Sequence, residues 1–260
     1  MKKKYAAMLW CMLFSTPFIQ AGEINPVEVG ITEKLEHSIP LHLSFVDDKG
    51  NRVLLKNIIR KPTILNFVYY RCPGICSPIL TELTNAVNTM DLKPGKDYQI
   101  LTISFDEREK FDLAAGKKES YFDLLDKNIP DSSWKFLTGD SVSIRTLTDA
   151  AGFMFKRDGN DFIHPGALIF ITPEGKIVRY LLGTQFLPFD VKMALIEAST
   201  GKSGSTTGFF LRMCYSYSPE RRTYVFNVVR VAGAGVIIFG LAAAFVITVK
   251  AKRNKTAKVK

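Results

Sequence analysis

The stretch NFVYYRCPGICSPILTEL, residues 66–83, decides the fold class because it joins an apolar run to a helical pattern through two cysteines. The run PTILNFVYY, which overlaps its start, has the continuous apolar character of a strand buried on both faces. After the cysteines, Ser77 is predicted to cap a helix that carries Pro78 in its first turn. Cys72 and Cys76 are therefore expected at a junction between a buried strand and a helix.

Strands alternate with helices on both sides of this junction. The pattern predicts a β-hairpin in LHLSFVDDKGNRVLL (41–55), a buried strand in YQILTISFD (98–106), a helix in DLAAGKKESYFDLLDK (112–127), a strand in SWKFLTGD (133–140), a helix over 141–150 capped by Asp140 or Ser141, a strand pair with a Glu-Gly turn in ALIFITPEGKIVRYLLG (167–183), and a last helix over about 189–200. This order predicts an α/β fold with a mixed sheet flanked by helices.

The two ends of the chain carry predicted export and membrane signals. Residues 1–21 combine three lysines with an apolar run, which is typical of a secretory signal cut after Ala21; a retained anchor is the alternative. From Val231 to Val249 there are nineteen residues without a charge. They suffice to cross a hydrocarbon layer of about 30 Å at about 1.5 Å per residue, although a buried core helix is the alternative. The basic residues that follow mark the cytoplasmic side.

These signals predict a single-pass protein of the inner membrane, with its globular domain on the periplasmic side and its tail in the cytoplasm. The predicted segments are a signal peptide at 1–21, a lead-in segment at 22–39, a globular domain at 40–200, a linker and juxtamembrane segment at 201–227, a transmembrane helix at 228–249 and a basic tail at 250–260.

The net charge of +10 does not indicate a nucleic-acid partner. Nine of the 35 basic residues lie in the signal and the tail, which leaves 26 against all 25 acids. The exported part is thus close to neutral, and its chemistry must be sought in particular residues rather than in an electrostatic surface.

Cys72 and Cys76 allow a structural disulfide, a redox pair or a metal site. A bridge across so short a loop removes little chain entropy, so stability alone is a poor reason for it. The start of a helix favours thiolate over thiol, and thiolates both attack disulfides and bind soft metals. Zinc prefers four ligands, for which no second pair is present, whereas two thiolates and one imidazole suit copper.

The third ligand would have to be one of three histidines. His37 and His42 flank Pro40 in a segment that is expected to be solvated. His164 lies in the loop GNDFIHPG before a buried strand, on the side of the sheet where a ligand for the cysteines is expected. From the pattern alone, a loop histidine that is either hydrogen-bonded within the fold or merely exposed is the better interpretation of His164.

Four motifs together resemble the SCO/SenC family of copper chaperones for the synthesis of cytochrome c oxidase. They are NFVYYRCPGICSPILTELTNAV, ILTISFDERE, FLTGD and DFIHPGALIFITPEGKI, and the resemblance extends from about Pro40 to Leu182. The sequence departs from the family pattern in having Pro165 after the histidine, Glu107 after Asp106, and its membrane helix at the C-terminal end.

The resemblance implies a thioredoxin-like fold in which Cys72, Cys76 and His164 bind one copper ion, as Cu(I) or Cu(II). It implies a metallochaperone that delivers copper to the dinuclear centre of oxidase subunit II. The alternative is a thiol-disulfide oxidoreductase that reduces client cysteines through Cys72 and Cys76, served by a thiol reductase partner. Asp106 matches a recurrent family acid, and either a turn-forming role or coordination is open to it.

Cys214 lies outside the motifs that carry the resemblance. It could be a buried apolar residue, a resolving thiol or an extra ligand.

Overall fold

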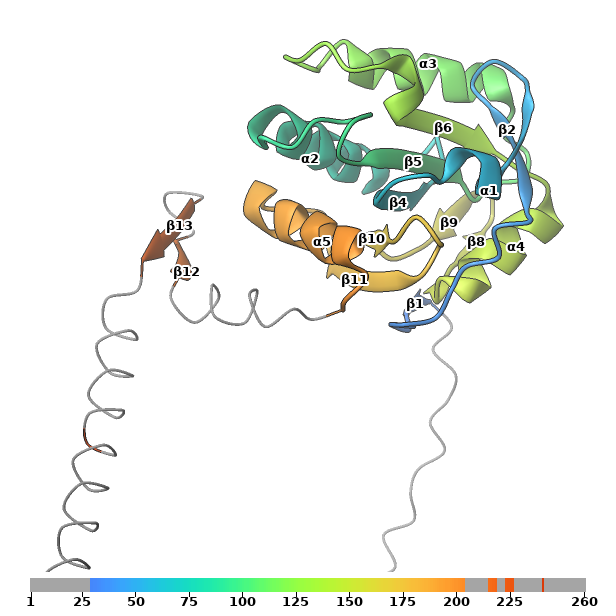
Figure 1. Ribbon diagram of the computed structural model, residues 1–260. Helices are drawn as coiled ribbons and strands as arrows, with labels where there is room; N and C mark the ends of the chain where they lie inside the picture. Colours follow the sequence, from blue (N-terminus) through green and yellow to red (C-terminus); the bar gives the residue numbers. More distant parts are fainter. Residues whose placement is uncertain (1–28, 204–214, 219–222, 227–239, 241–260) are drawn as a thin grey trace, which may run out of the picture.

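The computed structural model describes residues 29–203, 215–218, 223–226 and 240 (Figure 1). The predicted signal peptide, nearly all of the predicted transmembrane helix, the basic tail and Cys214 lie outside these residues. Among the residues that are described, no helix has both the length and the apolar character needed to cross a bilayer.

A mixed sheet of seven strands forms the centre of the domain, in the order β11-β10-β4-β5-β6-β2-β3. Its strands are β2 (Ser44–Asp47), β3 (Arg52–Leu54), β4 (Thr63–Val68), β5 (Gln99–Ser104), β6 (Trp134–Thr138), β10 (Ala167–Ile171) and β11 (Ile177–Leu182). β4, β5 and β6 are parallel, whereas β10 runs antiparallel to β4 and β2 antiparallel to β6. The predicted mixed α/β sheet is confirmed.

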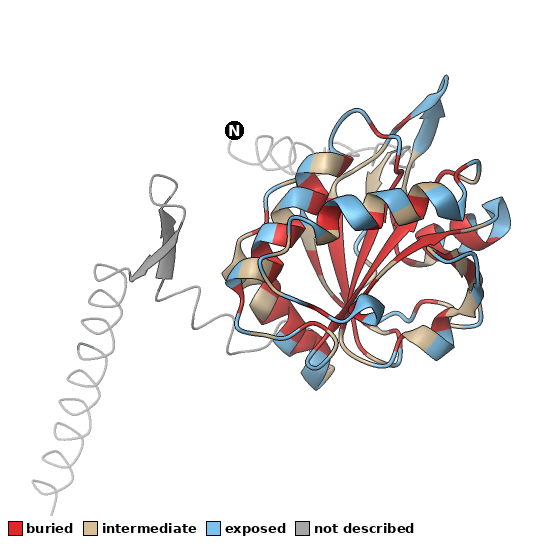
Figure 2. Cartoon of the chain, turned by 90° about the horizontal axis from the view of Figure 1, so that it is seen from above, coloured by how far each residue is buried: buried red, intermediate tan, exposed pale blue. Residues whose placement is uncertain are grey.

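The apolar runs form strands because helices and loops cover both of their faces. Every residue of β4, β5 and β10 is buried, which matches their lack of polar alternation. Figure 2 shows these buried strands in the middle of the domain, while the helices carry buried residues on one side and exposed residues on the other.

Five α-helices are present in the described part of the chain: α1 (Leu55–Ile58), α2 (Cys76–Thr89), α3 (Phe111–Phe122), α4 (Ser141–Ala150) and α5 (Pro188–Thr200), with a 3-10 turn at Asp131–Ser133. α2 contacts both α3 and α5, so these three helices form one layer, whereas α4 packs against the short strand β7 (Phe153–Met154). The predicted helices at 141–150 and 189–200 are confirmed, and the one at 112–127 ends earlier, at Phe122.

One predicted helix cap is confirmed and one is wrong. Asp140 accepts a hydrogen bond from the Ser143 N–H at 2.8 Å and caps α4. Ser77 does not cap α2, which begins one residue earlier, at Cys76, and has no side-chain cap. Instead, the Gly74 N–H donates to the Cys72 Sγ at 3.3 Å, so that a sulfur accepts a hydrogen bond just before the helix.

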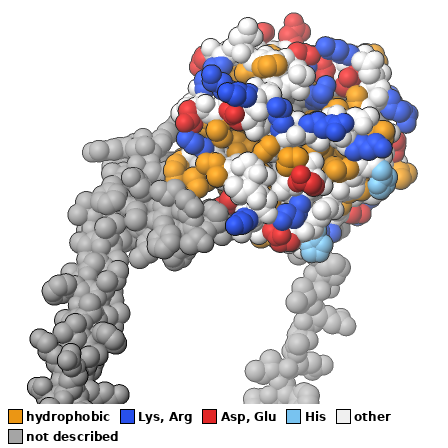
Figure 3. All heavy atoms as spheres, viewed as in Figure 1, with side chains coloured by type: hydrophobic (Ala, Val, Ile, Leu, Met, Phe, Trp, Pro, Cys, Tyr) orange, Lys and Arg blue, Asp and Glu red, His pale blue; other side chains and the backbone are white. Residues whose placement is uncertain are grey.

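Short strands extend the fold beyond the central sheet. β1 (Gly30–Ile31) pairs with β7, so part of the predicted lead-in segment contacts the domain. β8 (Lys156–Asp158) and β9 (Asp161–Ile163) form a hairpin that precedes His164. A further antiparallel pair, β12 (Tyr215–Ser218) and β13 (Thr223–Phe226), lies in the segment predicted as a linker. On the face in Figure 3, basic and acidic side chains are interspersed.

Candidate metal centre

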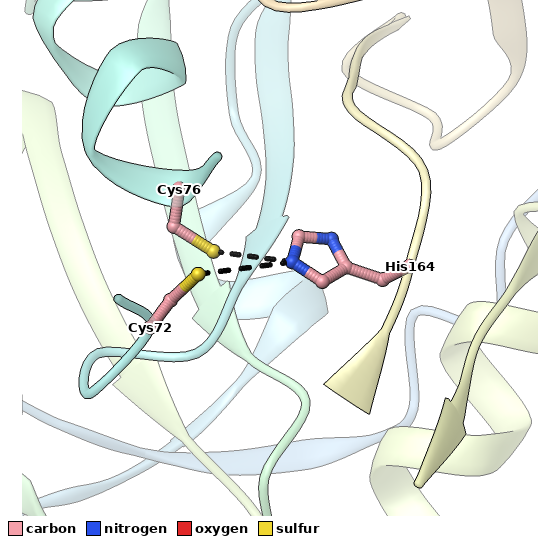
Figure 4. A group of neighbouring side chains, drawn as sticks. All are labelled: Cys72, Cys76 and His164. Atoms are coloured by element: carbon pink, nitrogen blue, oxygen red, sulfur yellow. Dashed lines mark hydrogen bonds between the residues drawn. The ribbon is translucent and has the colours of Figure 1, made fainter. Parts of the chain in front are cut away.

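Sheet topology brings the two cysteines and the histidine together. Cys72 lies in the loop after β4, and Cys76 is the first residue of α2. His164 lies between β9 and β10. Because β10 is the antiparallel neighbour of β4, with Leu168 opposite Asn66, the start of β10 lies beside the end of β4. Figure 4 shows the imidazole pointing from the loop just after β9 toward both sulfurs.

The distances permit one ion to contact all three side chains. The His164 Nε2 lies 3.5 Å from the Cys76 Sγ and 4.0 Å from the Cys72 Sγ. The three ligand atoms lie within 4.8 Å of one another, and no other group of three His, Cys, Asp or Glu residues in the described ranges has such an arrangement. Cys76 is 2% exposed and Cys72 9%, so the sulfurs lie at the mouth of the fold rather than on open surface.

A backbone contact orients the imidazole for coordination. The His164 Nδ1 lies 3.0 Å from the Pro165 carbonyl oxygen. Because a carbonyl can only accept, this contact requires the proton on Nδ1, which leaves the Nε2 lone pair of the neutral ring facing the sulfurs. A metal-binding histidine commonly has its other nitrogen held in this way.

The two thiols differ in their affinity for a proton. The pKa of Cys72 is lowered, first because the Cys76 thiol donates a hydrogen bond to its sulfur, and further by the backbone N–H groups of Cys76 and Gly74. The pKa of Cys76 is raised, because its proton is shared with the Cys72 thiolate and because the side chain is buried. When the pair holds a single proton, that proton is therefore on Cys76.

Aromatic rings surround the imidazole. The rings of Phe105 and Tyr69 lie 5.0 and 5.7 Å from that of His164, centroid to centroid, and Phe105 and Tyr69 also pack against Phe162. Tyr69 and Phe105 are buried. Such walls hold the ring in place and shield part of it from water, which strengthens electrostatic interactions there.

The other sequence candidates lie elsewhere. His37 and His42 are exposed and outside the group of three. Asp106 is buried, but its carboxylate is occupied by Arg108, whose Nε and Nη2 approach its two oxygens at 2.8 and 2.7 Å. The interpretation of Asp106 as a turn-forming residue therefore fits better than coordination.

Glu109 is a functional candidate that the sequence pattern does not indicate. Its carboxylate is 1% exposed and accepts hydrogen bonds from the backbone N–H groups of Tyr70 and Arg71, just before Cys72. The sequence feature that could have indicated Glu109 is its position a few residues after β5, at the same edge of the sheet where the cysteines follow β4.

The described domain has the thioredoxin-like α/β architecture, and it presents a thiol pair and an imidazole arranged for a soft metal ion. The family model described as SCO1/SenC matches residues 32–191, more than half of the chain. The protein thus belongs to the SCO1/SenC family.

Individual relatives agree with this assignment. The SCO1 protein homolog of Bacillus subtilis (strain 168) is 23% identical over 151 residues, which cover 56% of this chain and 75% of the relative. A crystal structure from Aquifex aeolicus VF5 is 29% identical with a TM-score of 0.59, covering 66% of this chain and 98% of that one. ScoI of Arabidopsis thaliana, solved with copper bound, is 22% identical with a TM-score of 0.51, covering 60% and 94%.

Proposed function

We propose that this protein is a membrane-anchored copper-binding assembly factor that delivers copper to the dinuclear centre of cytochrome c oxidase subunit II. The observation that carries the proposal is the convergence of Cys72, Cys76 and His164 on one point. Membership of the SCO1/SenC family and the copper-bound Arabidopsis relative favour copper over other soft metals.

The donor set fits copper in both oxidation states. Thiolates select Cu(I), and an imidazole accommodates Cu(II). The pKa of Cys72 is lowered and the His164 Nε2 is already oriented, so the proton that copper binding must displace from the thiol pair is that of Cys76. Bound copper would supply the metal that the client centre lacks, while the protein residues hold it and limit the access of water.

The proposed location follows from the ends of the sequence. A signal at 1–21 and a membrane helix at 228–249 would place the domain on the periplasmic side, with residues 250–260 in the cytoplasm. Tethering to the bilayer confines the search for a membrane-bound client and raises its effective concentration without any new contact.

Thiol-disulfide exchange is the second candidate function, and the asymmetry of the thiol pair favours it. The Cys72 thiolate is the more exposed of the two and would attack a client disulfide, releasing one client thiol and forming a mixed disulfide. Cys76, after losing its proton, would then displace the second client sulfur and close a Cys72–Cys76 disulfide. The client gains two electrons from the pair, one proton from Cys76 and one proton from solvent, and a thiol reductase partner would restore the pair.

Copper titration separates the two functions. The full chain in detergent, with its cysteines reduced, is titrated with Cu(I) and Cu(II) beside His164→Ala, the double variant Cys72→Ser/Cys76→Ser, and His37→Ala as a control on an exposed histidine. We expect one copper per wild-type chain and per His37→Ala chain. His164→Ala should lose at least about 10-fold in affinity, because even changes around a ligand cost that much. Equally weak binding by wild type and His164→Ala, with disulfide exchange intact, would instead establish the reductase.

Delivery is tested with the copper-loaded protein and the reduced, metal-free soluble domain of oxidase subunit II. Appearance of the absorption of the dinuclear centre in the client, and its absence with the double cysteine variant, is the expected result.

A further inference from the structure

The segment that follows β5 lies between the two halves of the metal centre. β5 is the parallel neighbour of β4, with Ser104 opposite Val68, so residues 105–109 leave the sheet beside the loop that carries Cys72. The same residues contact the β8–β9 hairpin, which leads into His164. Segment 105–109 is therefore in contact with both the cysteine side and the histidine side.

On the cysteine side, the contact is made by Glu109. Its two carboxylate oxygens accept from the Tyr70 N–H at 2.7 Å and the Arg71 N–H at 2.9 Å, and the Ser104 hydroxyl donates to it at 2.6 Å. Hydrogen bonds to a charged acceptor are about twice as strong as neutral ones, and these are shielded from water. The backbone immediately before Cys72 is thus held by a side chain from the neighbouring strand's loop.

On the histidine side, the contact is made by Arg108. Asp106, 2% exposed, fixes the guanidinium through a bidentate ion pair. The same Nη2 donates to the Asn160 carbonyl oxygen at 2.8 Å, in the turn of the hairpin. The guanidinium also lies 5.6 Å from the centre of the Phe162 ring, two residues before His164.

An ion pair also joins segment 105–109 to the hairpin. Arg157 of β8 donates to the Glu107 carboxylate at 2.6 Å and lies 4.6 Å from the Phe162 ring. Phe162 in turn packs edge-on against Phe105 and Tyr69, the rings that flank the imidazole. The hairpin is therefore fixed by segment 105–109 at several points.

We propose that Glu109 and the Asp106–Arg108 pair are positioning residues that hold the cysteine loop and the histidine hairpin at metal-binding distance before any metal arrives. The contacts between the His164 nitrogen and the sulfurs are long, at 3.5 and 4.0 Å, and cannot by themselves fix two loops. Asp106 would thus act on the site through Arg108, without touching the metal. The consequences for copper rest on the proposed function; those for the metal-free protein do not.

The test compares Arg108→Met with Glu109→Gln in the full chain. Arg145→Met is the matched control, because Arg145 pairs with Asp149 on an exposed face of α4. Amide hydrogen exchange of the metal-free protein should quicken at least about 10-fold over 158–163 in Arg108→Met, and over 70–74 in Glu109→Gln. Exchange in β10 and β11 should stay slow in both variants and report an intact fold.

Copper spectra distinguish positioning from a merely structural role, because the two substitutions should each affect a different ligand. In Cu(II)-loaded Arg108→Met, the nitrogen coupling of His164 in electron paramagnetic resonance should weaken while thiolate absorption persists. In Glu109→Gln, the thiolate absorption should change while the nitrogen coupling persists. Affinity should fall about 10- to 100-fold in each, as for other residues that orient ligands. Arg145→Met should match wild type.

Unchanged exchange at both loops would overturn the proposal, as would identical copper spectra in all variants. If wild type binds no copper, the proposed function fails, and the exchange data still decide whether the positioning residues act. If Glu109→Gln loses protection throughout β10, Ser104→Ala replaces it, since that change removes only the hydroxyl that holds the carboxylate.

Discussion

The Nε2 of His164 lies 3.5 Å from the Sγ of Cys76, although 88 residues separate them in the chain. This contact joins the nitrogen that faces the site to the sulfur that keeps its proton. A metal ion between them must displace that proton, so metal binding and proton release are linked at this pair.

Copper affinity should therefore rise with pH. Between about pH 7.5 and 9, the thiol proton that has to leave is that of Cys76, because the pKa of Cys76 is raised and that of Cys72 is lowered. Loading should release one proton, and the affinity should increase about tenfold per pH unit. Calorimetry in buffers of different ionisation enthalpy measures the proton. Release of two protons would show that Cys72 is also a thiol in the metal-free protein.

The lowered pKa of Cys72 predicts an alkylation rate that hardly changes with pH. An ordinary thiol loses reactivity below about pH 8.5, whereas the Cys72 thiolate should persist well below neutral pH. Cys76→Ala removes the donor that causes this shift and should restore a steep dependence near neutral pH. Cys76→Ser keeps an O–H donor and serves as the control. Mass spectrometry of iodoacetamide-treated protein at pH 5 to 9 gives the rates, and parallel profiles for both variants would contradict the assigned cause.

Most of the fold could be predicted because its strands are buried on both faces and so appear as continuous apolar runs. Thr63–Val68 and Ala167–Ile171 are of this kind. The pairing of Gly30–Ile31 with β7 could not be predicted, because two-residue strands carry no periodic pattern. The prediction that Ser77 caps the helix was wrong because α2 already begins at Cys76, which places Ser77 inside its first turn.

The metal centre could be predicted from the sequence less completely than the fold. The two cysteines are close in the chain, so their spacing indicated a site directly. His164 joins them only through the register of β10 against β4, and only the resemblance to a family favoured it as a ligand. Glu109 was missed because a carboxylate in a polar turn is usually solvated, whereas this one is enclosed by backbone N–H groups from another strand's loop.

Gly166→Ala should disturb the histidine side of the site by steric pressure. A Cβ at Gly166 would lie 2.6 Å from the Gly183 carbonyl oxygen and 3.0 Å from the Ile79 Cδ1, so the start of β10 would have to shift. We expect a loss of about 1–3 kcal/mol in the free energy of unfolding and weaker copper binding.

Gly116→Ala in α3 is the matched control for this substitution. No atom lies within 4 Å of the added methyl group, so helix propensity should raise stability by up to about 1 kcal/mol. Urea denaturation and copper titration measure both variants, and equal effects would contradict the steric explanation.

Lys118→Met should destabilise the domain strongly, because it removes one partner of a buried ion pair. The Lys118 Nζ lies 2.9 Å from an Asp48 oxygen, and both side chains are 8% exposed. Leaving the Asp48 carboxylate buried without a cation costs about 3–5 kcal/mol. Lys192→Met is the control, because the pair it makes with Asp91 is largely exposed and should contribute less than about 1 kcal/mol.

The same lysine should govern part of the acid sensitivity of the domain. Lys118 donates to Asp131 and, with Lys49, lowers the pKa of that carboxyl to about 2. A pKa below the unfolded value of about 3.9 means that the interaction stabilises the fold above about pH 4 and is lost as the pH falls toward 2. Lys118→Met should therefore lose less stability than wild type between pH 4 and 2. Urea midpoints at pH 7, 4 and 2.5 test this, and an equal decline in both proteins would show that other carboxylates control acid unfolding.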